Sequence, residues 1–251
     1  MPLAISPWTR PHYEAGGGSA FLFYVVYGNI DHTVPLSATK YRVEEMPPDL
    51  EVMTYRSPEH IETLRSFQEG YLWDEVAKNH PSFSDRIASQ TSCTILRGEF
   101  GDCPTLDYLR DTVGLITHML DHGGIAVYDP QMFHWWTPDE WREKIFDQAA
   151  PVPLHHTVIL TSQNADGTTE WIHTRGMRKF GRPDLSIPEV YPAWRTGAID
   201  LCHRFISLQA FGGLVPEGQQ VRLNTIPREL FCHHQGSLDD PDFNNIHISI
   251  H

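Results

Sequence analysis

The chain alternates short apolar runs with segments that carry one apolar face, a pattern that predicts a protein of mixed secondary structure. The clearest helix is expected over residues 105–121, where leucine, isoleucine and valine side chains recur every three or four positions. Gly123 and Gly124 end this helix, and the apolar residues 125–128 follow directly as a strand. A longer helix is predicted over residues 190–211, and its wide apolar face suggests a central position.

The remaining elements follow from the same patterns. Further helices are predicted over residues 58–77, 83–89 and 138–148, the last with Thr137 and Glu140 as a capping box. Strands are predicted over residues 20–27, 51–55, 92–97, 157–162, 169–174, 220–224 and 245–250. Asp166-Gly167 predicts a hairpin between two of these strands, and alternating isoleucines in the last strand predict one buried and one solvated face.

Interleaved strands and helices predict the α+β class, with a mixed, largely antiparallel sheet packed with several helices. A helix, two glycines and a strand follow one another twice, at residues 105–128 and 190–224, which suggests two related α/β halves. Residues 1–19 are expected to form an irregular N-terminal arm. Residues 20–251 are expected to form a single α+β domain, because no linker interrupts them.

Charge narrows the classes of function. The 251 residues include 32 acidic and 19 basic side chains, so the net charge is -13, and full protonation of the 15 histidines would bring it to +2. A strongly acidic chain argues against binding to nucleic acids or to anionic membranes. No apolar run reaches the roughly 18 residues of a membrane helix, and the N-terminus does not resemble a signal peptide. We therefore expect a cytoplasmic protein with four free cysteines and without a cofactor.

One basic segment stands out in this acidic chain. Four basic side chains fall within eight positions, two glycines allow a close approach of the backbone, and a histidine precedes them. The predicted ligand-binding residues are His173, Arg175, Arg178, Lys179 and Arg182. Such a cluster could bind an anionic small molecule or an acidic protein surface through forked hydrogen bonds. The alternative is that these side chains pair with acidic residues of the same chain.

The acidic segment at residues 238–245 offers a partner within the chain. Its carboxylates, at Asp239, Asp240 and Asp242, could bind calcium or magnesium, but the spacing lacks the EF-hand pattern. Asp and Asn before a strand more often build Asx turns. A direct pairing with residues 175–182 would make both segments one structural latch.

The histidines raise the alternative of a metal-dependent hydrolase. His118 and His122 are four residues apart on one predicted helix, a spacing that zinc ligands use. The glutamate of an HExxH motif is missing, however. His233 and His234 are adjacent, so on a strand they point to opposite faces and do not share a metal ion. A structural role for these histidines is therefore favoured over a metal site.

Few other residues or motifs in the sequence indicate a chemical activity. The aromatic residues 133–136 could line a pocket or belong to the core. The chain contains no GxSxG elbow, no P-loop and no GxGxxG after a strand. Whether the protein is an enzyme is therefore left open, and a protein-interaction or immunity-type protein is a third alternative.

Three segments resemble an uncharacterised family of bacterial proteins, a domain of unknown function. They are WIHTRGMRKFGRPDL at residues 171–185, LDDPDFNN at residues 238–245, and GGIAVYD at residues 123–129. The resemblance covers most of the chain from about residue 90 onward. It implies a bacterial cytosolic α+β protein, and it brings no activity and no catalytic residue.

Overall fold

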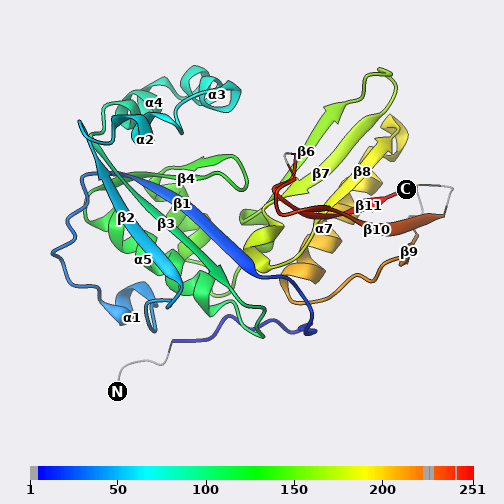
Figure 1. The fold of residues 1–251 in the computed structure, drawn as a ribbon, viewed down its shortest axis with the longest axis horizontal. Helices are drawn as coiled ribbons and strands as arrows, with labels where there is room; N and C mark the ends of the chain where they lie inside the picture. Colours follow the sequence, from blue (N-terminus) through cyan, green and yellow to red (C-terminus); the bar gives the residue numbers. More distant parts are fainter. Residues whose placement is uncertain (1–4, 223–225, 227–228, 241) are drawn as a thin grey trace. The chain divides into compact units, whose positions relative to one another are not determined.

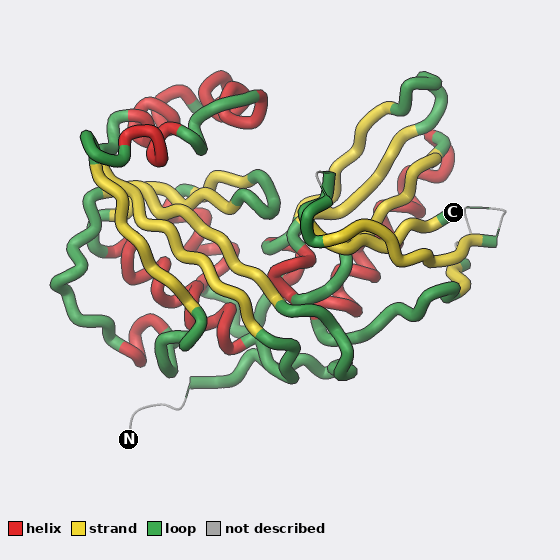
Figure 2. Tube along the Cα trace, in the orientation of Figure 1, coloured by secondary structure: helices red, strands yellow, loops and turns green. Residues whose placement is uncertain are grey.

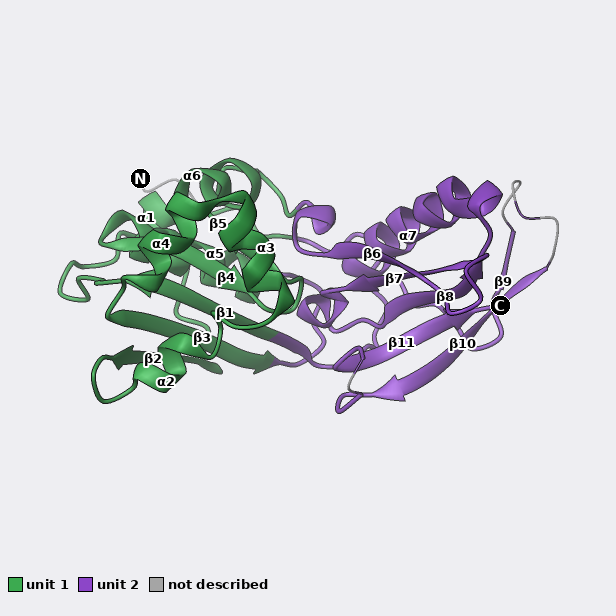
Figure 3. Cartoon of the chain, turned by 90° about the horizontal axis from the view of Figure 1, so that it is seen from above, with its two compact units in different colours: residues 1–8, 22–99, 107–151 green, residues 9–21, 100–106, 152–251 purple. Residues whose placement is uncertain are grey.

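The computed structural model describes residues 5–222, 226, 229–240 and 242–251, and it confirms the α+β class (Figures 1 and 2). The chain divides into two compact units (Figure 3). Unit 1 comprises residues 1–8, 22–99 and 107–151, and unit 2 comprises residues 9–21, 100–106 and 152–251. The expectation of one domain over residues 20–251 stays a prediction.

Unit 1 is built around an antiparallel sheet with the strand order β2-β3-β1-β4-β5. Its strands are β1 (Ala20–Gly28), β2 (Leu50–Arg56), β3 (Ser92–Phe100), β4 (Gly124–Asp129) and β5 (His134–Trp136). Its helices are α1 (Ala38–Tyr41), α2 (Ile61–Arg65), α3 (Tyr71–Asn79), α4 (Pro81–Ala88), α5 (Asp107–Asp121) and α6 (Pro138–Trp141), with a π turn over Arg142–Phe146.

Helices pack onto this sheet through the apolar positions that the sequence pattern marks. In α5 every residue from Tyr108 to Leu120 is buried, and the helix ends before Gly123, whose φ of 113° is a left-handed conformation. α2 and α4 contribute Leu64 and Ile87 to a core cluster that includes Trp135 of β5. The capping box of Thr137 and Glu140 at the start of α6 is present as predicted.

Unit 2 contains a six-stranded sheet with the order β6-β7-β8-β11-β10-β9. Its strands are β6 (Val158–Gln163), β7 (Glu170–Arg175), β8 (Asp184–Val190), β9 (Gln220–Val221), β10 (Leu230–Ser237) and β11 (Asn245–Ile250). β8 and β11 are parallel, whereas the other described pairs in this sheet are antiparallel. Its long helix is α7 (Arg195–Ala210), and 3-10 turns cover Pro153–His155, Met177–Phe180 and Pro192–Trp194.

α7 covers one face of the unit 2 sheet (Figure 3). Leu201, Cys202 and Phe205 of this helix form a buried cluster with Ile172 of β7 and Ile248 of β11. Because side chains alternate along a strand, the neighbours of these isoleucines point to the opposite face. That opposite face carries the candidate site.

Several predicted elements differ from the structure. The helix expected over residues 58–77 is split into α2 and α3, which are separated by Gly70 at a φ of 83°. The helix expected over residues 190–211 begins at Arg195, because Val190 ends β8 and Pro192–Trp194 form a 3-10 turn. β10 was not predicted as a strand, and residues 223 and 224 of the strand predicted over 220–224 lie outside the described residues. Among the described residues, no helix is long and apolar enough to cross a membrane.

Candidate functional site

The basic segment singled out in the sequence lies at the end of β7 and in the turn that follows. His173 and Arg175 belong to β7, Arg178 and Lys179 to the 3-10 turn, and Arg182 precedes β8 by two residues. The structure places these five side chains in quite different surroundings.

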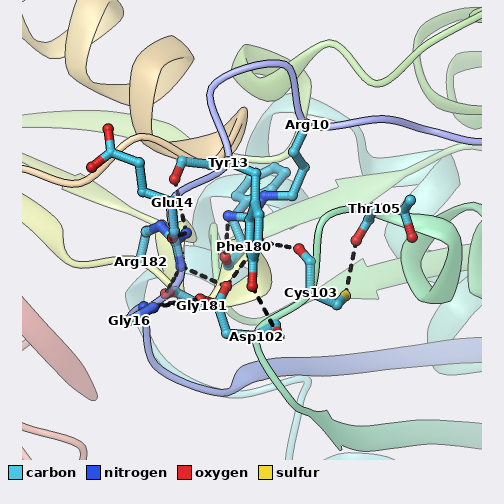
Figure 4. A network of polar contacts seen from close by, with 12 residues as sticks. Arg10, Tyr13, Glu14, Gly16, Asp102, Cys103, Thr105, Phe180, Gly181 and Arg182 are labelled. Atoms are coloured by element: carbon cyan, nitrogen blue, oxygen red, sulfur yellow. Dashed lines mark hydrogen bonds and ion pairs between the residues drawn. The ribbon is translucent and has the colours of Figure 1, made fainter.

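Two of the five side chains are buried and are bound by acceptors within unit 2. Lys179 is fully buried, and its Nζ donates a 2.7 Å hydrogen bond to the carbonyl oxygen of His156. Arg182 is 2% exposed and donates to Asp102 Oδ1 at 2.9 Å (Figure 4). It also donates to the carbonyl oxygen of Gly212 at 2.9 Å. Both cationic side chains are therefore hydrogen-bonded inside unit 2 and do not lie on its surface.

The carboxylate of Asp102 also compensates the charge of a second buried arginine, Arg10. Arg10 donates to Asp102 Oδ1 at 3.2 Å, and the backbone N–H of Gly17 donates to Oδ2 at 2.9 Å. Burial raises the pKa of Asp102, but the hydrogen bonds from Arg182 and Gly17 outweigh burial, so the pKa lies below its usual value. The network ties the arm at residues 9–21 to the rest of unit 2 (Figure 4).

Arg175 and Arg178 are half-buried and contact aromatic rings. The guanidinium of Arg178 lies 4.6 Å from the ring centroid of Phe21 and donates to Asn244, at 3.0 Å to its carbonyl oxygen and at 3.2 Å to Oδ1. The guanidinium of Arg175 lies 5.1 Å from the ring centroid of Phe243. Of the predicted basic ligand contacts, these two are the ones near the surface.

The acidic segment meets the basic one through these two arginines. Burial lowers the pKa of Arg175, whereas the charges of Asp242 and Asp240 act in the opposite direction, so the three groups interact electrostatically. Asp240 Oδ1 also accepts the backbone N–H groups of Asp242 and Phe243, both at 2.9 Å, which confirms the Asx turn. Arg182, in contrast, pairs with Asp102 rather than with the predicted latch carboxylates Asp239, Asp240 and Asp242.

The metal candidates at the end of α5, His118 and His122, do not assemble a site. The rings of His118 and His122 lie 4.6 Å apart, and His118 also contacts the ring of Tyr41 at 4.9 Å. Burial and the neighbouring His122 lower the pKa of His118. Within the described ranges, no group of three or more His, Cys, Asp or Glu side chains could hold a metal ion.

The candidates on β10 have separate partners. His233 Nδ1 lies 2.8 Å from Glu217 Oε1, and His234 Nε2 lies 2.8 Å from the carbonyl oxygen of Val215. The two histidines occupy consecutive positions of a strand and point to opposite faces of the sheet, as the sequence predicts.

A pocket of about 480 Å³ lies on the sheet face opposite to α7. Its floor comes from β7, β8, β10 and β11, and its wall from Asp240, Asp242 and Phe243. The aromatic and carboxylate side chains that line it are Trp171, Phe243, Asp240 and Asp242, and its neutral polar side chains include Ser186 and Ser249. Among the described residues that line the pocket there is no lysine and no arginine.

Four rings are packed together at this pocket. Trp171 and His173 stack at 3.9 Å, and Phe243 and His247 stack at 4.1 Å. The two stacks meet edge to face, with the ring centroids of Trp171 and Phe243 5.8 Å apart. Trp171 Nε1 donates to Ser186 Oγ at 2.9 Å, which fixes the orientation of the indole.

Both histidines of these stacks are neutral at pH 7. Burial lowers the pKa of His173 to about 4, and the charge of Arg175 acts in the same direction. Burial also lowers the pKa of His247, although Asp240 and Asp242 oppose this shift. Asp240 and Asp242 supply the carboxylates of the described pocket lining.

Trp171 and Phe243 were not predicted as site residues, although both lie in segments that the sequence singles out. The available signal was the alternation in β11, where Ile248 and Ile250 are buried and His247 and Ser249 face the pocket. That Trp171 of β7 joins this face depends on strand pairing that the sequence does not specify.

Comparisons with known proteins gave no match among protein-family models, curated proteins or solved structures. The resemblance to an uncharacterised bacterial family therefore stays an expectation.

Proposed function

We propose that unit 2 binds a small organic cation in the pocket on the open face of its sheet. The observation that supports this proposal is the pocket lining itself, which combines the aromatic rings of Trp171 and Phe243 with the carboxylates of Asp240 and Asp242. An ammonium group is attracted both to the face of an aromatic ring and to a carboxylate.

The charge balance around the pocket favours a cation over an anion. Asp240 and Asp242 line the pocket, while the nearest arginine that interacts with them, Arg175, is half-buried against Phe243. Because His173 and His247 are neutral at pH 7, the guanidinium of Arg175 interacts with three carboxylates, those of Asp184, Asp242 and Asp240. A cation in the pocket would compensate part of the remaining negative charge.

An anionic ligand or an acidic protein surface remains the competing proposal. It would have to use Arg175 and Arg178, since Lys179 and Arg182 are buried and bound within unit 2. In the pocket itself an anion would meet Asp240 and Asp242, and repulsion would oppose its binding. We also propose that the protein is cytoplasmic.

The ligand class is tested by calorimetric titration of the full chain with two probes of the same shape. Choline carries a quaternary ammonium group, and 3,3-dimethylbutan-1-ol replaces its nitrogen with carbon. We expect saturable 1:1 binding of choline and at least tenfold weaker binding of the alcohol, a difference of about 1.4 kcal/mol or more. Equal affinities would contradict a cation site, and binding of inorganic phosphate without binding of choline would favour the arginine hypothesis.

The position of the site is tested by a double variant, Asp240→Asn with Asp242→Asn. Asparagine keeps the oxygen that accepts the Asx-turn hydrogen bonds but removes both charges. We expect choline affinity to fall at least tenfold in this variant. The matched control is Asp239→Asn, an exposed carboxylate outside the pocket lining, which should retain the affinity. Equal choline affinity in both variants would place the cation elsewhere.

A further inference from the structure

Unit 1 contains a cavity of its own, between α3, α4 and the segment around β5. Its volume is about 360 Å³, and both apolar and polar side chains line it. The apolar ones are Leu72, Val76, Phe83, Phe133 and Trp135. The aromatic residues 133–136, which the sequence offers as pocket or core, thus serve both purposes: Trp135 and Trp136 are buried, and Phe133 is half-buried at the cavity.

α3 lies over this cavity and packs against the core through the partly buried side chains of Trp73 and Val76, with the ring of Trp73 5.3 Å from that of Trp135. None of its nine residues is buried, although Leu72 and Val76, four positions apart, lie on one side of the helix and line the cavity. In a helix that closes a core, such positions are normally buried. Here the apolar side of the helix borders a space that protein atoms do not fill.

Phe133 is held in an unfavourable backbone conformation at the same place. Its φ of 58° lies in the left-handed region, which is uncommon and unfavourable for a bulky side chain. Glycine or asparagine would fit this backbone better. The phenyl ring is nevertheless directed to the cavity lining, and strain of this kind is often concentrated at binding sites.

The carboxylates near the cavity are already engaged by neighbouring groups. Glu140 accepts hydrogen bonds from the backbone N–H and the hydroxyl of Thr137, at 3.2 and 3.0 Å. Glu75 accepts a hydrogen bond from Asn79 at 3.2 Å and lies 3.7 Å from Lys78 Nζ. The described lining contains no lysine or arginine, so an anion would find no countercharge and would be repelled by both glutamates.

We propose that this cavity binds a small uncharged molecule with an aromatic or branched apolar body. The apolar side chains of α3, α4 and residues 133–135 would enclose the body of the ligand, while Asn79, His80 or Thr137 would meet a polar substituent. The site is separate from the cation pocket of unit 2 and does not depend on it.

Two fluorescent probes with related ring systems test the proposal. N-phenyl-1-naphthylamine is uncharged, and 8-anilino-1-naphthalenesulfonate adds a sulfonate to the same ring system. We expect the uncharged probe to bind the full chain at one saturable site and to receive energy from the tryptophans, with at least tenfold weaker binding of the sulfonate. Absence of saturable binding, or equal affinity for the two probes, would overturn the proposal.

Two variants locate the probe. Phe133→Gly removes the ring and at the same time suits the left-handed backbone, so the fold should persist. Val76→Asp introduces a charge at a half-buried position of the cavity. Each should weaken binding of the uncharged probe at least tenfold, whereas Tyr71→Ala, at a side chain 74% exposed on the same helix and outside the lining, should not. Circular dichroism and melting temperature confirm folding, and unchanged affinity in a folded variant of either kind would refute the site.

Discussion

At the scale of single residues, the carboxylate of Asp102 neutralises two guanidinium groups that unit 2 removes from water. The side chains of Arg10 and Arg182 are 1% and 0% exposed, and both donate to Asp102 Oδ1. Gly17 approaches so closely that a Cβ at this position would overlap the guanidinium of Arg182. The burial of Arg182 thus depends on residues far apart in the sequence, at positions 10, 17 and 102.

Replacing Asp102 should therefore be costly. Asp102→Asn would leave two buried arginines without a countercharge, and we expect the free energy of unfolding to fall by about 3–5 kcal/mol, as for other broken buried ion pairs. Urea denaturation at pH 7 measures this. Glu170→Gln is the matched control, because its partner Arg195 is 48% exposed and such pairs contribute at most about 1 kcal/mol. A loss at Asp102 no larger than in the control would show that the network does not stabilise the unit.

At the scale of elements, β11 contributes side chains to both faces of the unit 2 sheet, and its first residue is hydrogen-bonded to the start of β8. Its first residue, Asn245, is 4% exposed and donates through Nδ2 to Asp184 Oδ2 at 2.7 Å and to the carbonyl oxygen of Arg182 at 3.1 Å. Thr174 Oγ1 donates to Asp184 Oδ1 at 2.9 Å. These side-chain bonds fix where β7, β8 and β11 begin or end relative to each other.

Asn245→Ala should loosen this junction. The substitution removes a hydrogen bond to a buried carboxylate, and we expect a loss of about 1–3 kcal/mol in the free energy of unfolding. Because burial already raises the pKa of Asp184 and the Asn245 bond opposes that shift, the pKa of Asp184 should rise further in the variant. Urea denaturation and carbonyl-region NMR measure the two effects.

The control Gln163→Ala removes an exposed hydrogen bond in the same sheet and should change stability by less than about 0.5 kcal/mol. If Asn245→Ala changed stability as little as the control, this junction would not hold the strands.

Elements with a strong local signal are the ones that could be predicted. The stripe of α5 and the hairpin at Asp166-Gly167 are each encoded by neighbouring residues, and the structure has both. The alternation predicted for β11 holds only in part, because Ile248 and Ile250 are buried but Ile246 is 39% exposed and Ser249 is buried. β8 was not predicted as a strand, and only its last residue, Val190, lies in the helix predicted over residues 190–211. Its parallel pairing with β11 joins segments about 60 residues apart, which no local pattern specifies.

The candidate site was predictable to a similar degree. Both segments that border it, at residues 171–182 and 238–245, stand out in the sequence, and a direct pairing between them was one of the alternatives. The individual roles were not predictable, because burial of Lys179 and Arg182 depends on acceptors at His156, Asp102 and Gly212. A cluster of basic residues in a sequence therefore does not distinguish ligand contacts from buried ion pairs.

At the scale of the whole molecule, the histidines connect charge with stability. Full protonation would change the net charge from -13 to +2, but the histidines do not titrate alike. Burial lowers the pKa of His156 to about 3 and that of His173 to about 4. Both rings are 6% exposed or less and remain neutral in the folded chain well below the pH at which they protonate in the unfolded chain.

This difference predicts that the folded state loses stability in mild acid. The unfolded chain binds protons at these histidines below about pH 6.5, and the folded chain does not. Each histidine therefore lowers the free energy of unfolding by about 2 kcal/mol between pH 7 and pH 5. Asp184 acts in the opposite direction: burial raises its pKa to about 6, so the folded chain takes up this proton first and regains about 1 kcal/mol. The net loss from these three groups should be roughly 2–3 kcal/mol.

Urea denaturation at pH 7, 6 and 5 measures this loss, and His156→Gln identifies its source. Glutamine does not titrate, so the variant should lose about 2 kcal/mol less than the unaltered chain between pH 7 and pH 5, whatever its stability at pH 7. His12→Gln is the control, because His12 lies in the same unit at an exposed position and its replacement should leave the pH dependence unchanged. A free energy of unfolding that stayed constant or rose toward pH 5 would contradict the neutral burial of His156 and His173, and with it the charge balance on which the cation pocket depends.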